Sequence, residues 1–291
     1  MIGIVSRGKH QPRKARHSVL VLAVMALATV IAVGGCSKKQ KKPKYVERPV
    51  AQIYDTAMKQ LRFKHYKFAA AAFDEVERQH PYSVWARRSQ LMAAYSHYLG
   101  NDYDEAILSA QRFLALHPGN KGAPYAYYLI AICYYEQISD VGRDQKMTEQ
   151  ALVSLNELVR RFPDTEYARD ARLKLELTLD HLAGKEMEIG RWYLKHGHYL
   201  AAILRFRTVV ERYGRTTHVP EALHRLSECY LALGIVPEAQ AAAAVLGRNF
   251  PDSDWYRDSY AMLEGTGAEG KGYAREKEKK SFLARVWNKV F

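Results

Sequence analysis

This 291-residue sequence has 11 histidines, 3 cysteines and 31 acidic residues, but their spacing does not group them into a catalytic or metal-binding cluster. His196 and His198 flank Gly197, and residues two apart do not share a helix face, so we interpret them as a solvated turn rather than a metal pair. Cys133 and Cys229 lie in separate apolar stretches. This favours two buried thiols, although an oxidising compartment would permit a disulfide.

Motifs of known enzyme classes are absent from the sequence. Neither HExxH nor GxSxG occurs, and the glycine-rich GAEGKG at 267–272 has no following Ser or Thr and no strand before it. An active site needs a nucleophile, a base and an orienting group together, and the carboxylates are instead scattered over helix surfaces. We therefore expect no enzyme, no metal and no cofactor.

One cysteine follows a segment of a different kind, VIAVGGCSKK at 30–39. An uncharged run from Ser18 to Val33 comes after five basic residues, which is typical of a secretory signal. With two more glycines the run approaches the roughly 20 residues of a membrane span, so length alone leaves an uncleaved anchor open. Val33-Gly34-Gly35-Cys36 resembles the lipobox of bacterial lipoproteins. That resemblance implies cleavage before Cys36, lipid on its thiol and an acyl chain such as palmitate on the new amine.

The basic charge of the chain lies in its ends. Residues 1–35, 37–50 and 270–291 each carry +5, whereas 51–269 carry −2, within a total of +13. A nucleic-acid-binding domain keeps its basic patch on the folded face, so we expect no nucleic acid partner. The lysines after Cys36 are placed to meet anionic headgroups at a membrane surface.

The body of the chain repeats itself five times. Each copy has a small residue, a second packing residue four positions later, and a helix-stopping Pro or Gly eight positions after that. Asp, Ser, Thr or Asn follows the stop as a cap for the next helix, as in Asp164-Thr165 and Asp252-Ser253. The five triplets are Ala69/Phe73/Pro81, Ala106/Ala110/Pro118, Ala151/Leu155/Pro163, Ala202/Phe206/Gly214 and Ala239/Ala243/Pro251.

This pattern resembles the tetratricopeptide repeat, a pair of antiparallel helices. Ile189/Gly190/Tyr193 and Leu226/Ser227/Tyr230 are similar to its Leu-Gly-x-x-Tyr element, with Gly197 and Gly234 in the following turns. Two units are enlarged: residues 136–147 form an insertion in the third, and residues 166–183 form an extra helical stretch before the fourth, with a bend expected at Gly184. The expected fold is all-α, a right-handed superhelix of five such pairs.

The expected organisation follows from these boundaries. It comprises a cleaved signal peptide (1–35), a lipidated cysteine with a basic linker (36–50), repeats one to three (51–165), repeats four and five (166–262) and a glycine-rich linker with a basic amphipathic tail (263–291). For the tail, three alternatives stay open. It lies on a membrane, it docks into a groove of a partner or of its own superhelix, or it is disordered.

A lipobox, a basic linker and five repeats together resemble the BamD (ComL) family, lipoprotein subunits of the machinery that assembles outer-membrane β-barrels. The resemblance covers roughly residues 30–262. It implies a non-enzymatic scaffold on the periplasmic face of the outer membrane, held there by lipid. The implied partners are the periplasmic domains of BamA, other Bam lipoproteins and unfolded barrel proteins. The alternative is a periplasmic repeat lipoprotein that coordinates cell-wall synthesis or envelope constriction.

Two sets of residues are candidates for these contacts. The resemblance places the targeting segment of an unfolded barrel protein on the N-terminal repeats, where tyrosines offer apolar area with a polar tip. It places BamA on the C-terminal repeats, where Arg205 and Arg207 can bind carboxylates. The predicted peptide-binding residues are Tyr54, Tyr95, Tyr98, Tyr128 and Tyr135.

Overall fold

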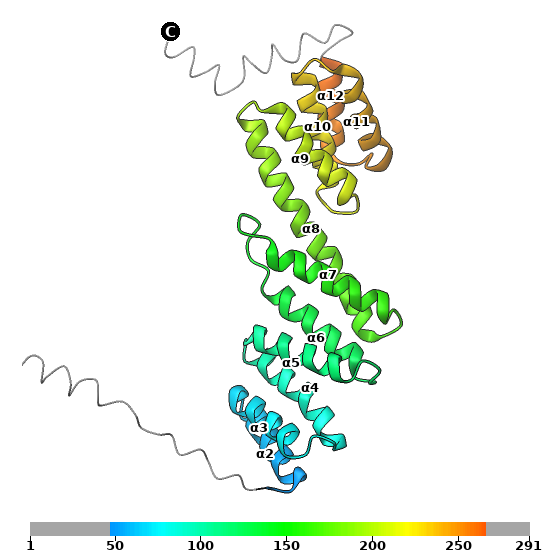
Figure 1. Cartoon of the computed structure of the whole chain (residues 1–291). Coiled ribbons are helices and arrows are strands. Elements are labelled where there is room, and N and C mark those ends of the chain that lie inside the picture. The colour runs from blue at the N-terminus through cyan, green and yellow to red at the C-terminus, as the bar shows by residue number, and fades with distance from the viewer. Residues whose placement is uncertain (1–46, 266–291) are drawn as a thin grey trace, which may run out of the picture. The chain divides into compact units, whose positions relative to one another are not determined.

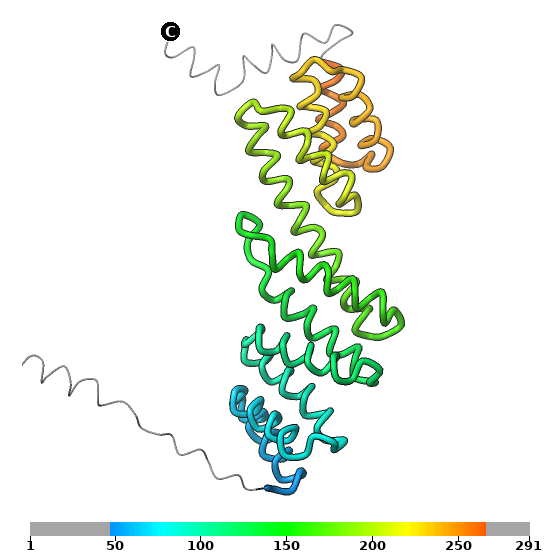
Figure 2. Tube along the Cα trace, in the orientation of Figure 1, coloured from blue at the N-terminus to red at the C-terminus, as the bar shows by residue number. Residues whose placement is uncertain are grey.

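The computed structural model describes residues 47–265, which form eleven helices and no strand (Figure 1). Ten of the helices make five successive antiparallel pairs, and neighbouring helices along the chain pack against each other (Figure 2). The fold is therefore the all-α superhelix of tetratricopeptide-like pairs that the repeats predicted. The pairs are α2 (Val50–Arg62) with α3 (Tyr66–Gln79), α4 (Val84–Leu99) with α5 (Tyr103–Leu116), α6 (Ala123–Glu136) with α7 (Lys146–Arg161), α8 (Glu166–Lys195) with α9 (Tyr199–Arg212), and α10 (Val219–Ala232) with α11 (Val236–Asn249).

The repeat triplets mark the packing side of each second helix. All ten of the paired small and larger residues, from Ala69 and Phe73 to Ala239 and Ala243, are buried. The helices end just before the predicted stops. In four of them the stop is a proline, which disfavours helical geometry in the residue before it, and in the fourth repeat it is Gly214. His80, before Pro81, has φ −134° and ψ 57°, and the corresponding residues of the second, third and fifth repeats adopt nearly the same angles.

In four of the pairs, the tight turn between the two helices contains one residue with a positive φ, in the left-handed region. Gly197 and Gly234 have a φ of +76°, as their predicted turn positions require. Lys64 and Asn101 take the same place in the first two repeats, with φ values of 60° and 58°. The third repeat lacks this turn because its insertion forms the loop 137–145 between α6 and α7.

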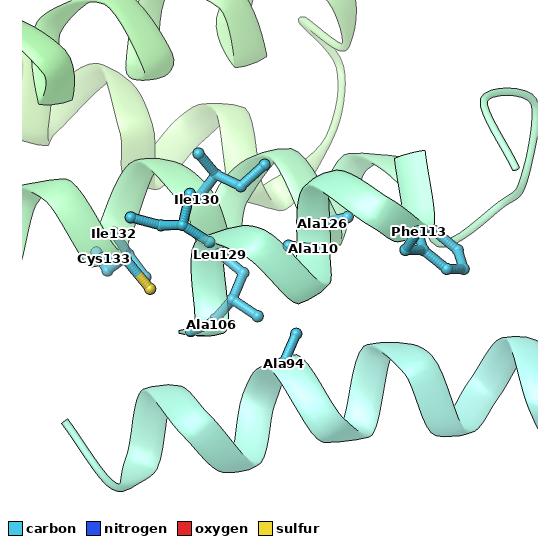
Figure 3. Packing of buried hydrophobic residues seen from close by; sticks show 10 residues of the cluster. Ala94, Ala106, Ala110, Phe113, Ala126, Leu129, Ile130, Ile132 and Cys133 are labelled. Atoms are coloured by element: carbon cyan, nitrogen blue, oxygen red, sulfur yellow. The ribbon is translucent and has the colours of Figure 1, made fainter. Parts of the chain in front are cut away.

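Small residues let the helices approach each other closely. In the largest core cluster, Ala94 of α4 faces Ala106 and Ala110 of α5, and Phe113 fills the space beside them (Figure 3). Leu129 and Cys133 of α6 close the cluster from the next repeat. The second repeat therefore buries apolar surface against the first helix of the third, as stacked repeats must.

Helix α8 is continuous over 30 residues, so the extra stretch and the first helix of repeat four form one element. Its N-terminal part packs on α6 and α7 and its C-terminal part on α9. Thr165 caps it by accepting a hydrogen bond from the Ala168 amide at 3.2 Å. The helix runs through Gly184 without a break in its hydrogen-bonded pattern.

A further helix, α12 (Asp254–Gly265), packs on α10 and α11 and was not predicted as an element of its own. Its Met262 is buried with Leu231 and Ala239. Cys133 and Cys229 are both buried and unbridged, which confirms the prediction of two separate thiols. Within residues 47–265 no helix combines the length and apolar character that a membrane crossing requires.

Several predictions concern parts of the chain outside the described residues. These are the signal peptide, Cys36, most of the basic linker and nearly all of the tail. The division of the array at 165/166 falls at the first residue of α8, whose contacts extend to both sides, and it stays a prediction.

Candidate interaction surfaces

Four of the five predicted peptide-binding tyrosines lie in one cluster on the first helices of repeats two and three. Tyr95 and Tyr98 of α4 stack with their ring centroids 6.4 Å apart. Tyr98, Tyr128 and Tyr135 pack against the same buried core between α4 and α6. All four rings are half-buried, so each keeps part of its surface accessible.

Three further tyrosines complete this cluster. Tyr103 of α5 lies 6.2 Å from the ring of Tyr98. Tyr167, at the start of α8, lies 5.6 Å from Tyr125 and 5.3 Å from Tyr128. We call the set of Tyr95, Tyr98, Tyr103, Tyr125, Tyr128, Tyr135 and Tyr167 the tyrosine cluster.

Polar partners fix the orientation of the cluster at its α8 edge. The Tyr128 hydroxyl donates a hydrogen bond to Asp170 Oδ2 at 2.9 Å, and Lys174 pairs with the same carboxylate at 3.0 Å. The Lys174 ammonium lies 5.5 Å from the ring centroid of Tyr135, a cation–π distance. Burial, and then the hydrogen bond to Asp170, raise the pKa of Tyr128, so its hydroxyl stays a donor at neutral pH.

Tyr54 lies apart from the tyrosine cluster, in the first repeat. It is only 7% exposed, with its ring 5.5 Å from Phe73 and 4.8 Å from Trp85. Arg88 lies above it at 5.8 Å. The sequence could not separate Tyr54 from the others, because helical spacing alone does not say how deeply a ring is covered by the next repeat.

The two candidate arginines on α9 do not act as a pair. They are two positions apart on the helix, so their side chains leave it in different directions. Arg205 forms an ion pair with Glu186 of α8 at 3.1 Å, and Arg207 pairs with Glu211 one turn along α9 at 2.7 Å. Arg205 therefore ties α9 to α8, whereas Arg207 is bound only within its own helix.

A cleft of about 370 Å³ lies between the loop 137–145, α8 and the segment before α10. Its polar groups fasten these elements to each other. Asp180 accepts hydrogen bonds from the Thr217 amide at 2.9 Å and hydroxyl at 2.7 Å, and His218 lies 3.5 Å from the same carboxylate. Arg191 binds Glu221 of α10 through two hydrogen bonds of 2.8 and 2.5 Å. In the described part of the chain no three His, Cys, Asp or Glu side chains gather as metal ligands would.

The partners of the tyrosine cluster on α8 were not predicted. Tyr167, Asp170 and Lys174 recur at helical spacing in the sequence, which marks them as one stripe. Only the stacking of α8 on α6 shows that this stripe faces the tyrosines.

Comparison with known proteins identifies the family. Residues 46–246 match the YfiO family, described as outer membrane lipoprotein. A protein of Caulobacter vibrioides named Outer membrane protein assembly factor BamD is 54% identical over 87% of this chain and 83% of its own length. The chain belongs to the BamD family. A Rickettsia prowazekii member with the same name is 42% identical over 84% of this chain and 96% of its own length.

Membership of the BamD family confirms the resemblance drawn from the lipobox, linker and repeats. Among solved structures, a thermophilic tetratricopeptide-repeat protein of Thermus thermophilus aligns with 74% of the chain at 19% identity, with a TM-score of 0.34. That likeness is too low to support an argument, and the fold assignment rests on the five helix pairs and their shared turns.

Proposed function

We propose that this chain is a non-enzymatic scaffold of the outer-membrane β-barrel assembly machinery. The observation that carries the proposal is the 54% identity, over most of both chains, to an outer membrane protein assembly factor. The names of the relatives described above give no support to the alternative role in cell-wall synthesis or constriction. Depletion of the chain should lower outer-membrane barrel proteins before cell-wall defects appear. The opposite order would contradict the proposal.

The location follows from the family and from the predicted lipobox. We propose that the chain is attached to the periplasmic face of the outer membrane through acyl chains on Cys36. The family description supports association with this membrane. Mass spectrometry of the purified N-terminal peptide tests the attachment. It should show acyl chains on Cys36. A chain in which residues 1–36 are replaced by a cleavable signal without a lipobox should leave the membrane fraction.

The tyrosine cluster is our proposed contact for the targeting segment of an unfolded barrel protein. Its rings offer apolar area with polar hydroxyl tips, and the Lys174 ammonium beside them is paired with Asp170. These features suit a peptide that alternates apolar and polar side chains. Tyr54 contributes to this proposal only through packing, because 93% of its surface is covered.

Site-specific crosslinking tests this contact. A photoreactive residue at position 95 or 128 should capture a peptide from the C-terminus of a barrel protein. The matched control is position 260 on α12, a tyrosine that is 52% exposed and outside the cluster. Equal capture at 260, or none at 95 and 128, would exclude the cluster as the binding surface.

We propose that BamA docks near α9, with Arg205 as the candidate contact and Arg207 as the second. Because Arg205 pairs with Glu186, Arg205→Glu would place two carboxylates together and disturb the helix pair as well. The double variant Glu186→Arg/Arg205→Glu restores that internal pair with reversed charges. If Arg205 contacts BamA, co-purification should fail in both variants. Recovery in the double variant would assign Arg205 a structural role only.

A further inference from the structure

An apolar group projects from the turn between the first two repeats. Tyr82 is 97% exposed and Val84 is 73% exposed, at the junction of α3 and α4. Trp85 beside them is 39% exposed, and its inner face packs on Tyr54 at 4.8 Å. The buried Tyr54 thus holds Trp85 in place while the outer residues point away from the core. We call Tyr82, Val84 and Trp85 the first-repeat turn.

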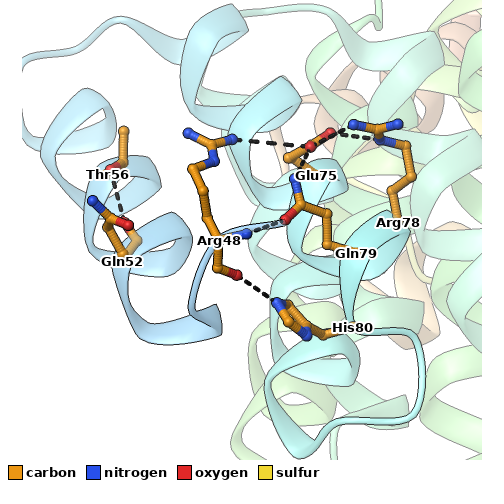
Figure 4. A network of polar contacts seen from close by, with 7 residues as sticks. All are labelled: Arg48, Gln52, Thr56, Glu75, Arg78, Gln79 and His80. Atoms are coloured by element: carbon orange, nitrogen blue, oxygen red, sulfur yellow. Dashed lines mark hydrogen bonds and ion pairs between the residues drawn. The ribbon is translucent and has the colours of Figure 1, made fainter. Parts of the chain in front are cut away.

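The chain enters the fold next to the first-repeat turn. The Arg48 amide donates a hydrogen bond to Gln79 Oε1 at 2.9 Å, and His80 Nε2 donates one to the Arg48 carbonyl at 2.7 Å (Figure 4). The Arg48 guanidinium also lies 3.9 Å from Glu75. His80 stands two positions before Tyr82. These contacts fasten Arg48 to the residues just before the turn.

The length of the preceding segment limits how far this turn can be from a membrane. Cys36 and Arg48 are twelve residues apart, a reach of about 43 Å at most. Five of those residues are lysines, which are attracted to anionic headgroups. With Cys36 lipidated, as the proposed function states, Arg48 and the residues that it contacts before the first-repeat turn lie within about 43 Å of the anchor.

The charged residues that directly follow the turn in the sequence are positive. Arg87 and Arg88 follow in the first turns of α4, where the helix dipole already favours anions, and no acidic residue lies in the first turn of that helix. Within residues 47–265 neither arginine forms an ion pair with the protein. Tyr and Trp prefer the membrane–water interface, and arginines beside them favour anionic lipid.

From these observations we infer that the first-repeat turn docks on the anionic phospholipid surface of the membrane that holds the anchor. Tyr82 and Val84 enter the headgroup region, and Arg87 and Arg88 bind lipid phosphates. The contact gives the scaffold a second attachment point, so the first repeat keeps a defined orientation at the membrane instead of turning freely on its linker.

Fluorescence quenching on vesicles tests this contact. The full-length lipidated chain, with an environment-sensitive fluorophore at Tyr82→Cys, is placed on phosphatidylethanolamine–phosphatidylglycerol vesicles with brominated acyl chains. The matched control is Phe68→Cys, 72% exposed at the opposite end of α3. Cys133 and Cys229 are buried and should not take the label. We expect quenching at 82 and not at 68, and loss of the difference on phosphatidylcholine vesicles.

A second measurement separates this inference from the lipid anchor. The chain that begins at residue 37, which lacks both the signal segment and the lipid, should sediment weakly with phosphatidylglycerol vesicles. Tyr82→Ser/Val84→Ser should reduce that binding several-fold while leaving the Tyr54–Trp85 contact intact. Absence of acyl chains on the native protein would contradict the proposed anchor but not this result. Equal quenching at 82 and 68, or protection of position 82 by BamA in lipid-free complexes, would overturn the inference.

Discussion

Gly190 of α8 offers a direct test of how closely the repeats pack. A Cβ atom at this position would lie 2.5 Å from Cε1 of Phe206 and 2.9 Å from two further ring atoms. Phe206 is completely buried on α9, with its ring enclosed by the core around Met187 and Cys229. The ring cannot move away without displacing its neighbours, so Gly190→Ala forces the two helices apart.

Gly184 in the same helix provides the matched control. It is also buried, but a Cβ there would meet only the Nε2 tip of His218 at 3.2 Å and the Val141 methyl groups at 3.7 Å. Both substitutions gain about 1 kcal/mol of helix propensity. Overpacking in a core costs about 1–3 kcal/mol, and only Gly190→Ala incurs it in full. The free energies of unfolding of the two variants should therefore differ by about 1–3 kcal/mol, with Gly190→Ala the less stable.

Urea unfolding followed by circular dichroism measures this difference in unfolding free energy. Thermal unfolding measures it independently, because the midpoint temperature should shift by about 2–4 °C per kcal/mol. In the double variant Gly190→Ala/Phe206→Leu, the smaller side chain should absorb part of the clash, so its stability loss should be less than the sum of the single losses. If Gly190→Ala unfolded at the same urea concentration as Gly184→Ala, the close approach of α8 and α9 would be refuted.

The remaining predictions concern buried groups. Burial raises the pKa of the thiols of Cys133 and Cys229 to about 12, so at pH 8 only about one in 10⁴ is ionised, and a thiol reagent should label them on unfolding but not in the native protein. Burial opposes ionisation of Glu221, but hydrogen bonds and charge from Arg191 outweigh it and hold the pKa of Glu221 below its usual 4.5. The stabilisation from this carboxylate is therefore present above pH 4.5 and lost as the pH falls further, so the stability difference between wild type and Glu221→Gln should be largest near neutral pH and disappear in acid. Tyr128→Phe should cost about 1 kcal/mol, because it removes the hydrogen bond to Asp170, whereas Tyr95→Phe should cost less; equal losses would contradict the Asp170 contact.

Much of the fold could be predicted because its determinants are local in sequence. Each second helix carries a small residue and a packing residue one turn apart, and its Pro or Gly stop follows at a constant distance. These features act within one helix and the turn that follows it. They can therefore be recognised in the sequence without knowing which helices pack against it. The burial of the first two residues of every triplet and the positive φ of Gly197 and Gly234 confirm them.

The candidate sites were less predictable because they depend on contacts between repeats. Helical spacing predicted the same role for Tyr54 and Tyr98. In the structure Tyr54 is covered by Trp85 of the next repeat, whereas Tyr98 is only partly buried. Likewise, the order of residues gave no sign that Arg205 is bound by Glu186 of α8. In a repeat array, the neighbouring repeat decides how deeply a side chain is buried. The sequence of one helix does not predict the angle at which that neighbour packs.

By itself, then, the sequence determined the repeat, its stops, the absence of known catalytic motifs and the family to which the chain is similar. The tertiary structure decided which tyrosines form one surface, how α8 joins two repeats as a single helix and where the incoming chain is fastened at Arg48. The physical reason is the distance along the chain over which each kind of interaction acts. Helix formation and capping act over four or five residues, whereas a surface is assembled from side chains brought together by stacking of helices that lie tens of residues apart in the chain.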